Sequence, residues 1–259
     1  NTYATGTVSG GINSGGLIWY QEDLASVTNS FYDMETTGQS DTGKGTGLTT
    51  AEMTDPFTFI DAGWDFETVW SKSAAGENSD YMMLRGFSSD TLYDDFVRLS
   101  GDTSKTYGSA NPSLDGITLD GAGTDNVTLS WGSAISDTTG VGYYAYAGDA
   151  GVVDVTGADD RSVYVDYGSD GLTISKAALT VTANDDSKTY DGLAYSGGNG
   201  ITYDGFVNGE DSSVLGGSVT FGGTSQGAVN AGTYAISASG LTADNYDITF
   251  VDGSLDAEK

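Results

Sequence analysis

The tetrapeptide Ser104-Lys105-Thr106-Tyr107 occurs again as Ser187-Lys188-Thr189-Tyr190, 83 residues further along the chain. Beyond these anchors, Gly142-Tyr143-Tyr144-Ala145-Tyr146 corresponds to Gly232-Thr233-Tyr234-Ala235-Ile236 with a shift of 90 residues. A shift that changes between fixed anchors indicates loops of different length on one shared framework. We therefore predict two tandem copies of one domain within this chain of 259 residues.

Both copies are expected to be β domains. We place the first repeat at residues 96–178 and the second repeat at residues 179–259. The alternation of apolar and polar residues that predicts half-buried strands runs through residues 179–183, 218–221, 233–237 and 246–250. Asx-Gly pairs lie between these runs and supply the positive φ that tight turns require. We expect at most one short helix in each repeat, near residues 210–215 in the second.

The composition excludes several classes of function. Lys and Arg number 9 against 37 Asp and Glu, which gives a formal net charge of −28. Such a surface repels phosphate backbones and anionic lipids, so neither nucleic acid nor a membrane surface is an expected partner. Because the chain has no His and no Cys, imidazole bases, thiol nucleophiles, disulfides and Cys or His metal sites are excluded too. The sequence also lacks a run of about 18 apolar residues, so we expect no membrane insertion.

Residues 1–95 follow a different pattern. Asn1-Thr2-Tyr3 and Asn29-Ser30-Phe31 lie 28 residues apart and enclose short apolar runs that glycines join. Short strands that recur in this way predict a terminal coil of a β-solenoid. Thr49 and Glu52 form a capping box for a short helix. The aromatic residues that follow are expected to close the open end of the solenoid, and they are Phe57, Phe59, Trp64, Phe66 and Trp70.

The predicted fold class is therefore all-β. It begins with the end of a β-solenoid and a short helical cap region over residues 1–95. Two tandem Gly-rich β modules follow, which are the first and the second repeat.

Two groups of motifs resemble known families. The stretches Asn1-Thr2-Tyr3-Ala4-Thr5-Gly6, Gly15-Gly16-Leu17-Ile18 and Asn29-Ser30-Phe31-Tyr32-Asp33 resemble the GLUG repeats of very large secreted bacterial surface proteins. Both repeats resemble the MBG or YDG modules, through Lys188-Thr189-Tyr190-Asp191-Gly192, Ala231-Gly232-Thr233-Tyr234 and Asn245-Tyr246. Together the resemblances cover nearly the whole chain.

This combination is similar to filamentous-haemagglutinin-like adhesins that are exported by two-partner secretion. The resemblance implies a secreted protein of the bacterial cell surface or biofilm matrix, without enzymatic activity. It implies as partners a glycan or a protein on a surface, a host or a neighbouring cell, and further repeats of the parent chain. One departure is that Gly108 follows Tyr107 where the second repeat has an Asp, so we expect the first repeat to have a different loop there.

Without His, an enzyme would depend on carboxylate chemistry of the glycosidase type or on a Ser-Lys arrangement. Neighbouring acids are frequent, but we interpret each pair as solvated acids of a polar turn, so the sequence predicts no catalytic residue. These pairs are Glu22-Asp23, Asp94-Asp95, Asp159-Asp160, Asp185-Asp186 and Glu210-Asp211. Two alternatives to the adhesin remain open, which are a polysaccharide-degrading β-solenoid enzyme and a purely structural spacer.

Calcium is the cofactor for which the sequence offers candidate ligands. The stretch from Asp120 to Asp125 partly fits the calcium nonapeptide pattern, although a single copy is also what a hairpin turn contains. A second candidate site is the Asp-rich insertion of the first repeat, with Asp149, Asp154, Asp159 and Asp160.

Aromatic side chains are the candidates for ligand binding because ring faces stack on sugars. The repeat alignment predicts core positions for Trp131, Tyr144 and Tyr146 and an outward position for Tyr143. The candidate ligand-binding residues are Trp19, Tyr20, Tyr32 and Tyr143.

Overall fold

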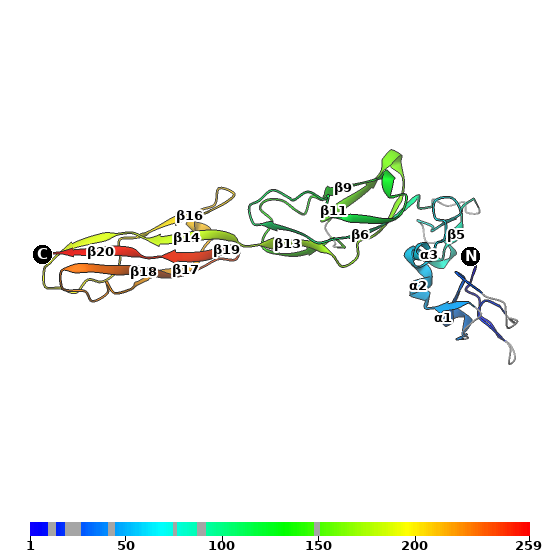
Figure 1. The fold of residues 1–259 in the computed structure, drawn as a ribbon, viewed down its shortest axis with the longest axis horizontal. Coiled ribbons are helices and arrows are strands. Elements are labelled where there is room, and N and C mark those ends of the chain that lie inside the picture. The colour runs from blue at the N-terminus through cyan, green and yellow to red at the C-terminus, as the bar shows by residue number, and fades with distance from the viewer. Residues whose placement is uncertain (10–13, 19–26, 41–44, 75–76, 87–91, 148–150) are drawn as a thin grey trace. The chain divides into compact units, whose positions relative to one another are not determined.

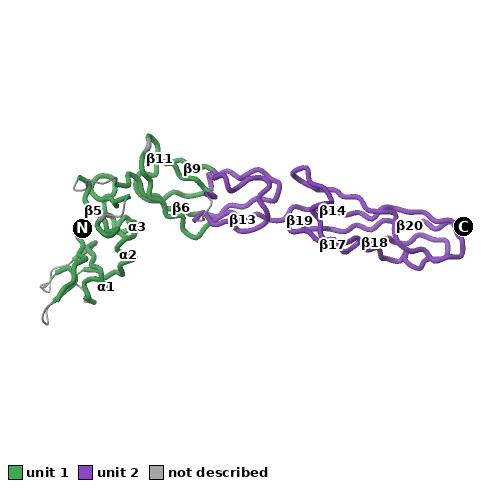
Figure 2. Tube along the Cα trace, turned by 180° about the vertical axis from the view of Figure 1, so that it is seen from behind, with its two compact units in different colours: residues 1–101, 117–130, 153–170 green, residues 102–116, 131–152, 171–259 purple. Residues whose placement is uncertain are grey.

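The computed structural model describes residues 1–9, 14–18, 27–40, 45–74, 77–86, 92–147 and 151–259. It consists mainly of β-strands with a few short helices, so the prediction of an all-β chain is confirmed (Figure 1). The chain divides into two compact units (Figure 2). The N-terminal unit contains residues 1–101, 117–130 and 153–170, and the C-terminal unit contains residues 102–116, 131–152 and 171–259.

Short parallel strands begin the N-terminal unit. These strands are β1 (Tyr3–Ala4), β2 (Phe31–Asp33) and β3 (Thr46–Leu48). Tyr3 pairs with Phe31 across β1 and β2, so the 28-residue spacing seen in the sequence is the spacing of stacked parallel strands. Phe31 pairs in turn with Thr46. The described parts of the two runs between β1 and β2, residues 7–9 and 14–18, lie outside the strands.

Short helices follow this stack. They are α1 (Met34–Thr37), α2 (Thr50–Thr54) and α3 (Pro56–Asp61). The predicted capping box is confirmed, since Thr49 and Glu52 each bind the other's backbone N–H at the start of α2. Asp33 caps α1 and also accepts hydrogen bonds from the Thr50 and Tyr81 hydroxyls at 2.8 and 2.5 Å. One buried carboxylate therefore joins β2, α1, α2 and the segment before β5.

The aromatic residues expected to close the solenoid form the core of the N-terminal unit. Phe57, Phe59, Trp64 and Phe66 are buried, and Trp70 packs against them half-buried. The same cluster contains Phe31 of β2 together with Phe96 and Ala122 from the first repeat. This shared core explains why part of the first repeat belongs to the N-terminal unit.

Two further strands, β4 (Trp70–Ser71) and β5 (Met83–Leu84), pair as an antiparallel ribbon. The 3-10 helix η1 (Glu77–Asp80) lies between them in the chain. Among the described residues, the helices are all too short and too polar to cross a membrane.

In the described part of the chain, the first repeat has eight strands and the second has seven, and two of their sheets correspond. The strands of the first are β6 (Asp95–Ser100), β7 (Thr103–Thr106), β8 (Thr118–Ala122), β9 (Val127–Trp131), β10 (Gly142–Ala145), β11 (Val153–Gly157), β12 (Val163–Asp166) and β13 (Gly171–Ser175). The strands of the second are β14 (Ala177–Ala183), β15 (Asp186–Thr189), β16 (Ile201–Asp204), β17 (Gly216–Gly222), β18 (Gly232–Thr242), β19 (Tyr246–Val251) and β20 (Gly253–Glu258).

Corresponding sheets of the two repeats agree in order and in strand direction. The order β12-β6-β8 corresponds to β19-β14-β16, with a parallel pair followed by an antiparallel pair in each. Likewise β10-β13-β7 corresponds to β18-β20-β15, with an antiparallel pair followed by a parallel pair. Ile174 pairs with Lys105 and Ala257 pairs with Lys188, which is the same register.

The short helices of the repeats correct one expectation. The helix expected near residues 210–215 is present as η4 (Ser212–Val214). The first repeat has two such helices rather than at most one, η2 (Thr124–Asn126) and η3 (Ala158–Asp160). Both η2 and η3 follow a glycine at a strand end, where a single turn reverses the chain without adding a packed helix.

Candidate functional sites

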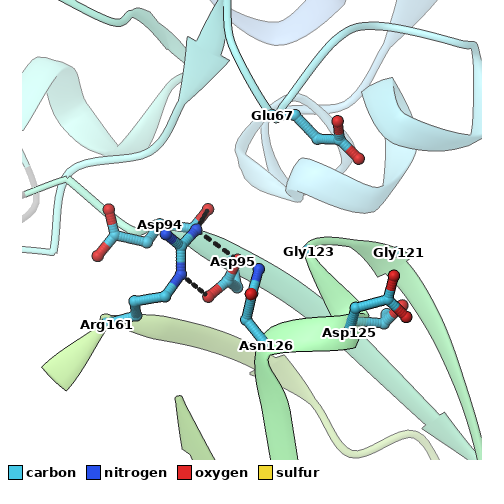
Figure 3. Close-up of a pocket in the computed structure, with 9 residues that line it drawn as sticks. Glu67, Asp94, Asp95, Gly121, Gly123, Asp125, Asn126 and Arg161 are labelled. Atoms are coloured by element: carbon cyan, nitrogen blue, oxygen red, sulfur yellow. Dashed lines mark hydrogen bonds and ion pairs between the residues drawn. The ribbon is translucent and has the colours of Figure 1, made fainter. Parts of the chain in front are cut away.

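An acidic pocket of about 340 Å³ lies in the N-terminal unit (Figure 3). Asp95 at the start of β6 and Asp94 directly before it line the pocket, together with residues of the turn between β8 and β9. The lining residues are Glu67, Asp94, Asp95, Gly121, Gly123, Thr124, Asp125, Asn126 and Arg161. The pocket is therefore rich in carboxylates and contains one guanidinium.

The central contact of the pocket is an ion pair between Asp95 and Arg161. Nε of Arg161 donates to Asp95 Oδ2 at 2.6 Å and Nη2 donates to Oδ1 at 2.7 Å, a bidentate arrangement (Figure 3). Asp95 is fully buried, whereas the Arg161 side chain is 37% exposed. The hydrogen bonds to Asp95 raise the pKa of Arg161. Asp95 was predicted to be a solvated turn acid, and that prediction is wrong because a strand buries it against an arginine.

Gly123 shows why the turn beside this ion pair is glycine-rich. A Cβ at this position would lie 1.9 Å from Asp95 Oδ1, and the backbone φ of +79° is one that L side chains rarely adopt. Both observations demand glycine. Close approach to the buried carboxylate thus accounts for a glycine of the stretch that resembles a calcium loop.

Hydrogen bonds engage two arginines of the N-terminal unit and several carboxylates along the chain. Arg161 is held by Asp95, and Arg85 donates to the carbonyls of Phe66 and Trp70 at 2.8 and 3.0 Å. Carboxylates elsewhere in the described part of the chain, namely Glu52, Asp65, Asp191 and Asp211, have their pKa lowered by hydrogen bonds from neighbouring groups. A general acid in glycoside hydrolysis needs a raised pKa, so these carboxylates have the opposite tuning.

A second candidate site joins the two repeats inside the C-terminal unit. Tyr107, directly after β7, donates from its hydroxyl to Glu210 Oε1 at 2.7 Å. The hydroxyl of Tyr246, at the start of β19, donates to Glu210 Oε2. The rings of Tyr107 and Tyr246 meet edge to face with 5.7 Å between centroids. One half-buried carboxylate thus receives one phenol from each repeat.

Burial and hydrogen bonding at this junction shift both phenols in the same direction. The hydrogen bond to Glu210 and burial raise the pKa of Tyr107. Burial and the same carboxylate raise the pKa of Tyr246 to about 12. Both phenols therefore remain neutral donors at any physiological pH.

Backbone contacts extend the junction on both sides. Asn245 Oδ1 accepts from the Val141 N–H at 3.0 Å, and Asn208 Nδ2 donates to the Asp137 carbonyl at 3.2 Å. Val207 packs over Gly108, where a Cβ would lie 2.3 Å from Val207 Cγ2. We call Tyr107, Glu210 and Tyr246 with these flanking contacts the repeat junction.

The structure places the candidate ligand-binding residues apart. Tyr143 on β10 is 54% exposed, which confirms its predicted outward position. Tyr32 on β2 is 1% exposed and lies in the interior of the N-terminal unit. Trp19 and Tyr20 lie outside the described residues. Among the predicted core rings, Tyr146 is buried and Trp131 and Tyr144 are half-buried.

The candidate calcium ligands are distributed over several elements. Asp120 is exposed on β8, Asp125 is exposed in η2 at the acidic pocket, and Asp154 is exposed on β11. Asp159 is exposed in η3, which also contains the backbone of Asp160, and Asp149 lies outside the described residues. In the part of the chain that is described, these acids do not form a group of three or more that could hold a metal ion.

The repeat junction contains a residue that sequence reasoning misassigned. Glu210 was interpreted as a solvated acid of a polar turn, but it is half-buried and binds two tyrosines. Its partners belong to the recurring Ser-Lys-Thr-Tyr stretch and to Asn245-Tyr246 of the second repeat. The available signal was the recurrence of Tyr107 as Tyr190, but it does not identify the acceptor.

Comparison with known protein families supports the resemblance of the second repeat to the MBG modules. Residues 179–256 match the family described as the MBG domain (YGX type). The chain is also similar to the "Putative Gly-rich membrane protein" of Evansella cellulosilytica, with 35% identity over 178 residues. The alignment covers 64% of this chain and 19% of that protein, so the chain spans about a fifth of the length of this relative.

Proposed function

We propose that this chain is a non-enzymatic stalk segment of an extracellular, surface-attached adhesin. The observation that carries the proposal is the repeat junction, in which Glu210 binds tyrosines from both repeats. Hydrogen bonds, ring packing and a backbone contact at Asn245 combine there. Such a junction restrains consecutive modules, which is what a stalk requires.

The comparisons support a surface location. The match of residues 179–256 to the MBG domain is the basis for an adhesin-like, non-enzymatic role. The relative in Evansella cellulosilytica is named a Gly-rich membrane protein, which supports attachment of a much longer chain to a cell surface. Export by two-partner secretion, GLUG-type repeats and a role in biofilm attachment are part of the proposal.

The proposal can be tested by measuring how tightly the junction holds. Because the chain has no cysteine, Ser133→Cys with Thr233→Cys allows specific spin labelling on either side of the junction, at exposed positions of the C-terminal unit. We expect a narrow distance distribution between the two labels. The same labels with Glu210→Ala should give a broader distribution, because both tyrosines lose their acceptor. A broad distribution in the chain without Glu210→Ala would contradict a stalk.

Tyr143 supports a second role, the presentation of a ligand-binding surface. Its ring is 54% exposed on β10 and lies over Gly171, where a Cβ would be 2.8 Å from the ring Cζ. Aromatic faces held in this way bind sugars by stacking. A glycan array tests the role with Tyr143→Ala and, as a matched control, Tyr190→Ala, whose ring is 55% exposed. Glycan binding lost in Tyr143→Ala alone would support ligand presentation, and equal binding by both variants would contradict it.

A further inference from the structure

Tyr107 and Tyr190 occupy equivalent places in the two repeats. Each follows the second strand of its repeat, β7 or β15, in the recurring Ser-Lys-Thr-Tyr stretch. The Tyr107 N–H donates to the Ser175 carbonyl, and the Tyr190 N–H donates to the Glu258 carbonyl. These acceptors lie at the ends of β13 and β20, which correspond to each other. The two tyrosines therefore mark the same end of the same fold.

Their surroundings differ completely. Tyr107 is 3% exposed because the second repeat covers it at the repeat junction. Tyr190 is 55% exposed, and Leu193 beside it is 67% exposed. This end of the second repeat thus presents a phenol and a large apolar side chain to solvent.

We propose that the end of the second repeat around Tyr190 and Leu193 is a docking surface for a further repeat of the same kind, which supplies a carboxylate equivalent to Glu210. The proposal rests on the stalk function proposed above and names the partner of this end of the second repeat. The repeat junction supports it, because the same end of the first repeat is already covered by such a partner.

The covalent spacing agrees with this partner. Lys176 links β13 to β14, and its Nζ donates to the Ala243 carbonyl of the second repeat at 2.8 Å. Lys259 follows β20 in the same way. If a further repeat starts directly after Lys259, its first strand has the same place relative to the second repeat that β14 has relative to the first repeat.

The chemistry of the junction also suits two acidic partners. The chain has 37 acidic and 9 basic residues, so a junction built on ion pairs would lack cations. Phenol hydroxyls and backbone N–H groups are neutral donors, and they can satisfy a carboxylate without a counter-charge. Tyr190 offers this kind of donor at the corresponding end of the second repeat.

The residues that follow Tyr107 and Tyr190 differ, and this difference sets a condition on the partner. Gly108, with φ of +81°, follows Tyr107, whereas Asp191 follows Tyr190 and the glycine with positive φ is Gly192. The expectation of a different loop in the first repeat is thus confirmed. Since Val207 packs directly on Gly108, an incoming repeat needs a smaller residue at that position to leave room for the Asp191 side chain.

The test extends the full chain by one repeat. A second copy of residues 177–259 is appended after Lys259. This appended copy alone has Val207→Gly, which leaves room for Asp191, and Tyr190→Phe, so that a single Tyr190 remains in the extended chain. Tyrosine nitration followed by peptide mass spectrometry then compares Tyr190 in the extended and the 259-residue chain. We expect the nitration rate of Tyr190 to fall about tenfold in the extended chain, which corresponds to about 1.4 kcal/mol of docking free energy.

A matched variant identifies the chemistry. Glu210→Ala in the appended copy alone should return the Tyr190 nitration rate to that of the shorter chain. Equal rates in the extended and the shorter chain, with circular dichroism showing that the appended copy is folded, would overturn the proposal. Protection that persists with Glu210→Ala would overturn the assigned carboxylate. The spin labels at Ser133→Cys and Thr233→Cys report the existing junction separately, so failure of the stalk is distinguished from failure of this docking surface.

Discussion

The Glu210 carboxylate accepts a hydrogen bond from the Tyr107 hydroxyl at 2.7 Å, although 103 residues separate the two. The contact crosses from the first repeat to the second within one compact unit. Tyr246 occupies the other oxygen of the same carboxylate. The contact between the two repeats therefore includes one acid and two phenols, and a single substitution removes each of these groups.

Tyr107→Phe removes one of these hydrogen bonds and keeps the ring. We expect the free energy that holds the repeat junction closed to fall by about 1.5–3 kcal/mol, because a buried hydrogen bond to a charged group is lost. Hydrogen exchange of the Val141 amide, which donates to Asn245 across the junction, should accelerate tenfold or more. The control is Tyr190→Phe at the exposed equivalent position, where a change within about 0.5 kcal/mol is expected. Equal effects of the two substitutions would contradict the role of Tyr107.

Alkaline pH should destabilise the second repeat in a defined window. The pKa of Tyr246 and the pKa of Tyr195 are each raised to about 12, first by burial and then by the carboxylates of Glu210 and Asp186. Both phenols are protonated in the folded state up to that pH, while in the unfolded chain they ionise near the ordinary pKa of 10.0. The stabilisation that these two phenols contribute is therefore fully present below pH 10 and is lost between pH 10 and about 12.

Denaturant unfolding at a series of pH values measures this loss. In the window, each of the two phenols should lower the free energy of unfolding by about 1.4 kcal/mol per pH unit. Tyr246→Phe should remove one such contribution from the slope. A slope that stays the same in Tyr246→Phe would show that this phenol does not titrate as described.

The parts of the fold that depend on local pattern were predictable from the sequence. Alternation of period two predicted the strands, and Thr49 with Glu52 predicted the capped helix α2. Tyr146 and Ile236, at corresponding positions of the two repeats, are 1% and 0% exposed as the alignment predicted. These features need only neighbours within a few residues, or a second copy for comparison.

The parts that depend on a distant partner were not predictable. Glu210 and Asp95 look like other members of acidic pairs in the sequence, and what separates them is a partner far along the chain. Tyr107 is 103 residues from Glu210, and Arg161 is 66 residues from Asp95. The parallel pairing of β12 with β6 brings Arg161 to Asp95, and no short-range pattern specifies that pairing.

We expect no calcium binding at the turn from Asp120 to Asp125, so calcium should leave the melting temperature of the protein unchanged. Both carboxylates are exposed on separate elements, and Gly123 is required by Asp95 rather than by a cation. Since a ligand of the folded state must raise the melting temperature, calorimetry with and without millimolar calcium checks this directly. A calcium-dependent rise that disappears in Asp125→Asn would establish a metal site at this turn.

Asp95→Asn tests the ion pair at the acidic pocket. The substitution keeps the volume of the side chain, so it leaves no cavity, but it removes the charge that faces Arg161 at 2.6 and 2.7 Å. We expect a loss of about 3 kcal/mol, at the lower end for a buried pair because Arg161 is 37% exposed. Asp61→Asn is the matched control, since Asp61 is 55% exposed and pairs with Arg98 at 3.2 Å, and it should cost less than about 1 kcal/mol.

Denaturant unfolding followed by the fluorescence of Trp64 and Trp70, which lie in the same unit, measures both variants. Salt distinguishes the two pairs further, because screening weakens the Asp61 pair and leaves the buried Asp95 pair nearly unchanged. Equal and small losses in the two variants would show that Arg161 is held by its other contacts and that Asp95 is not the centre of the pocket.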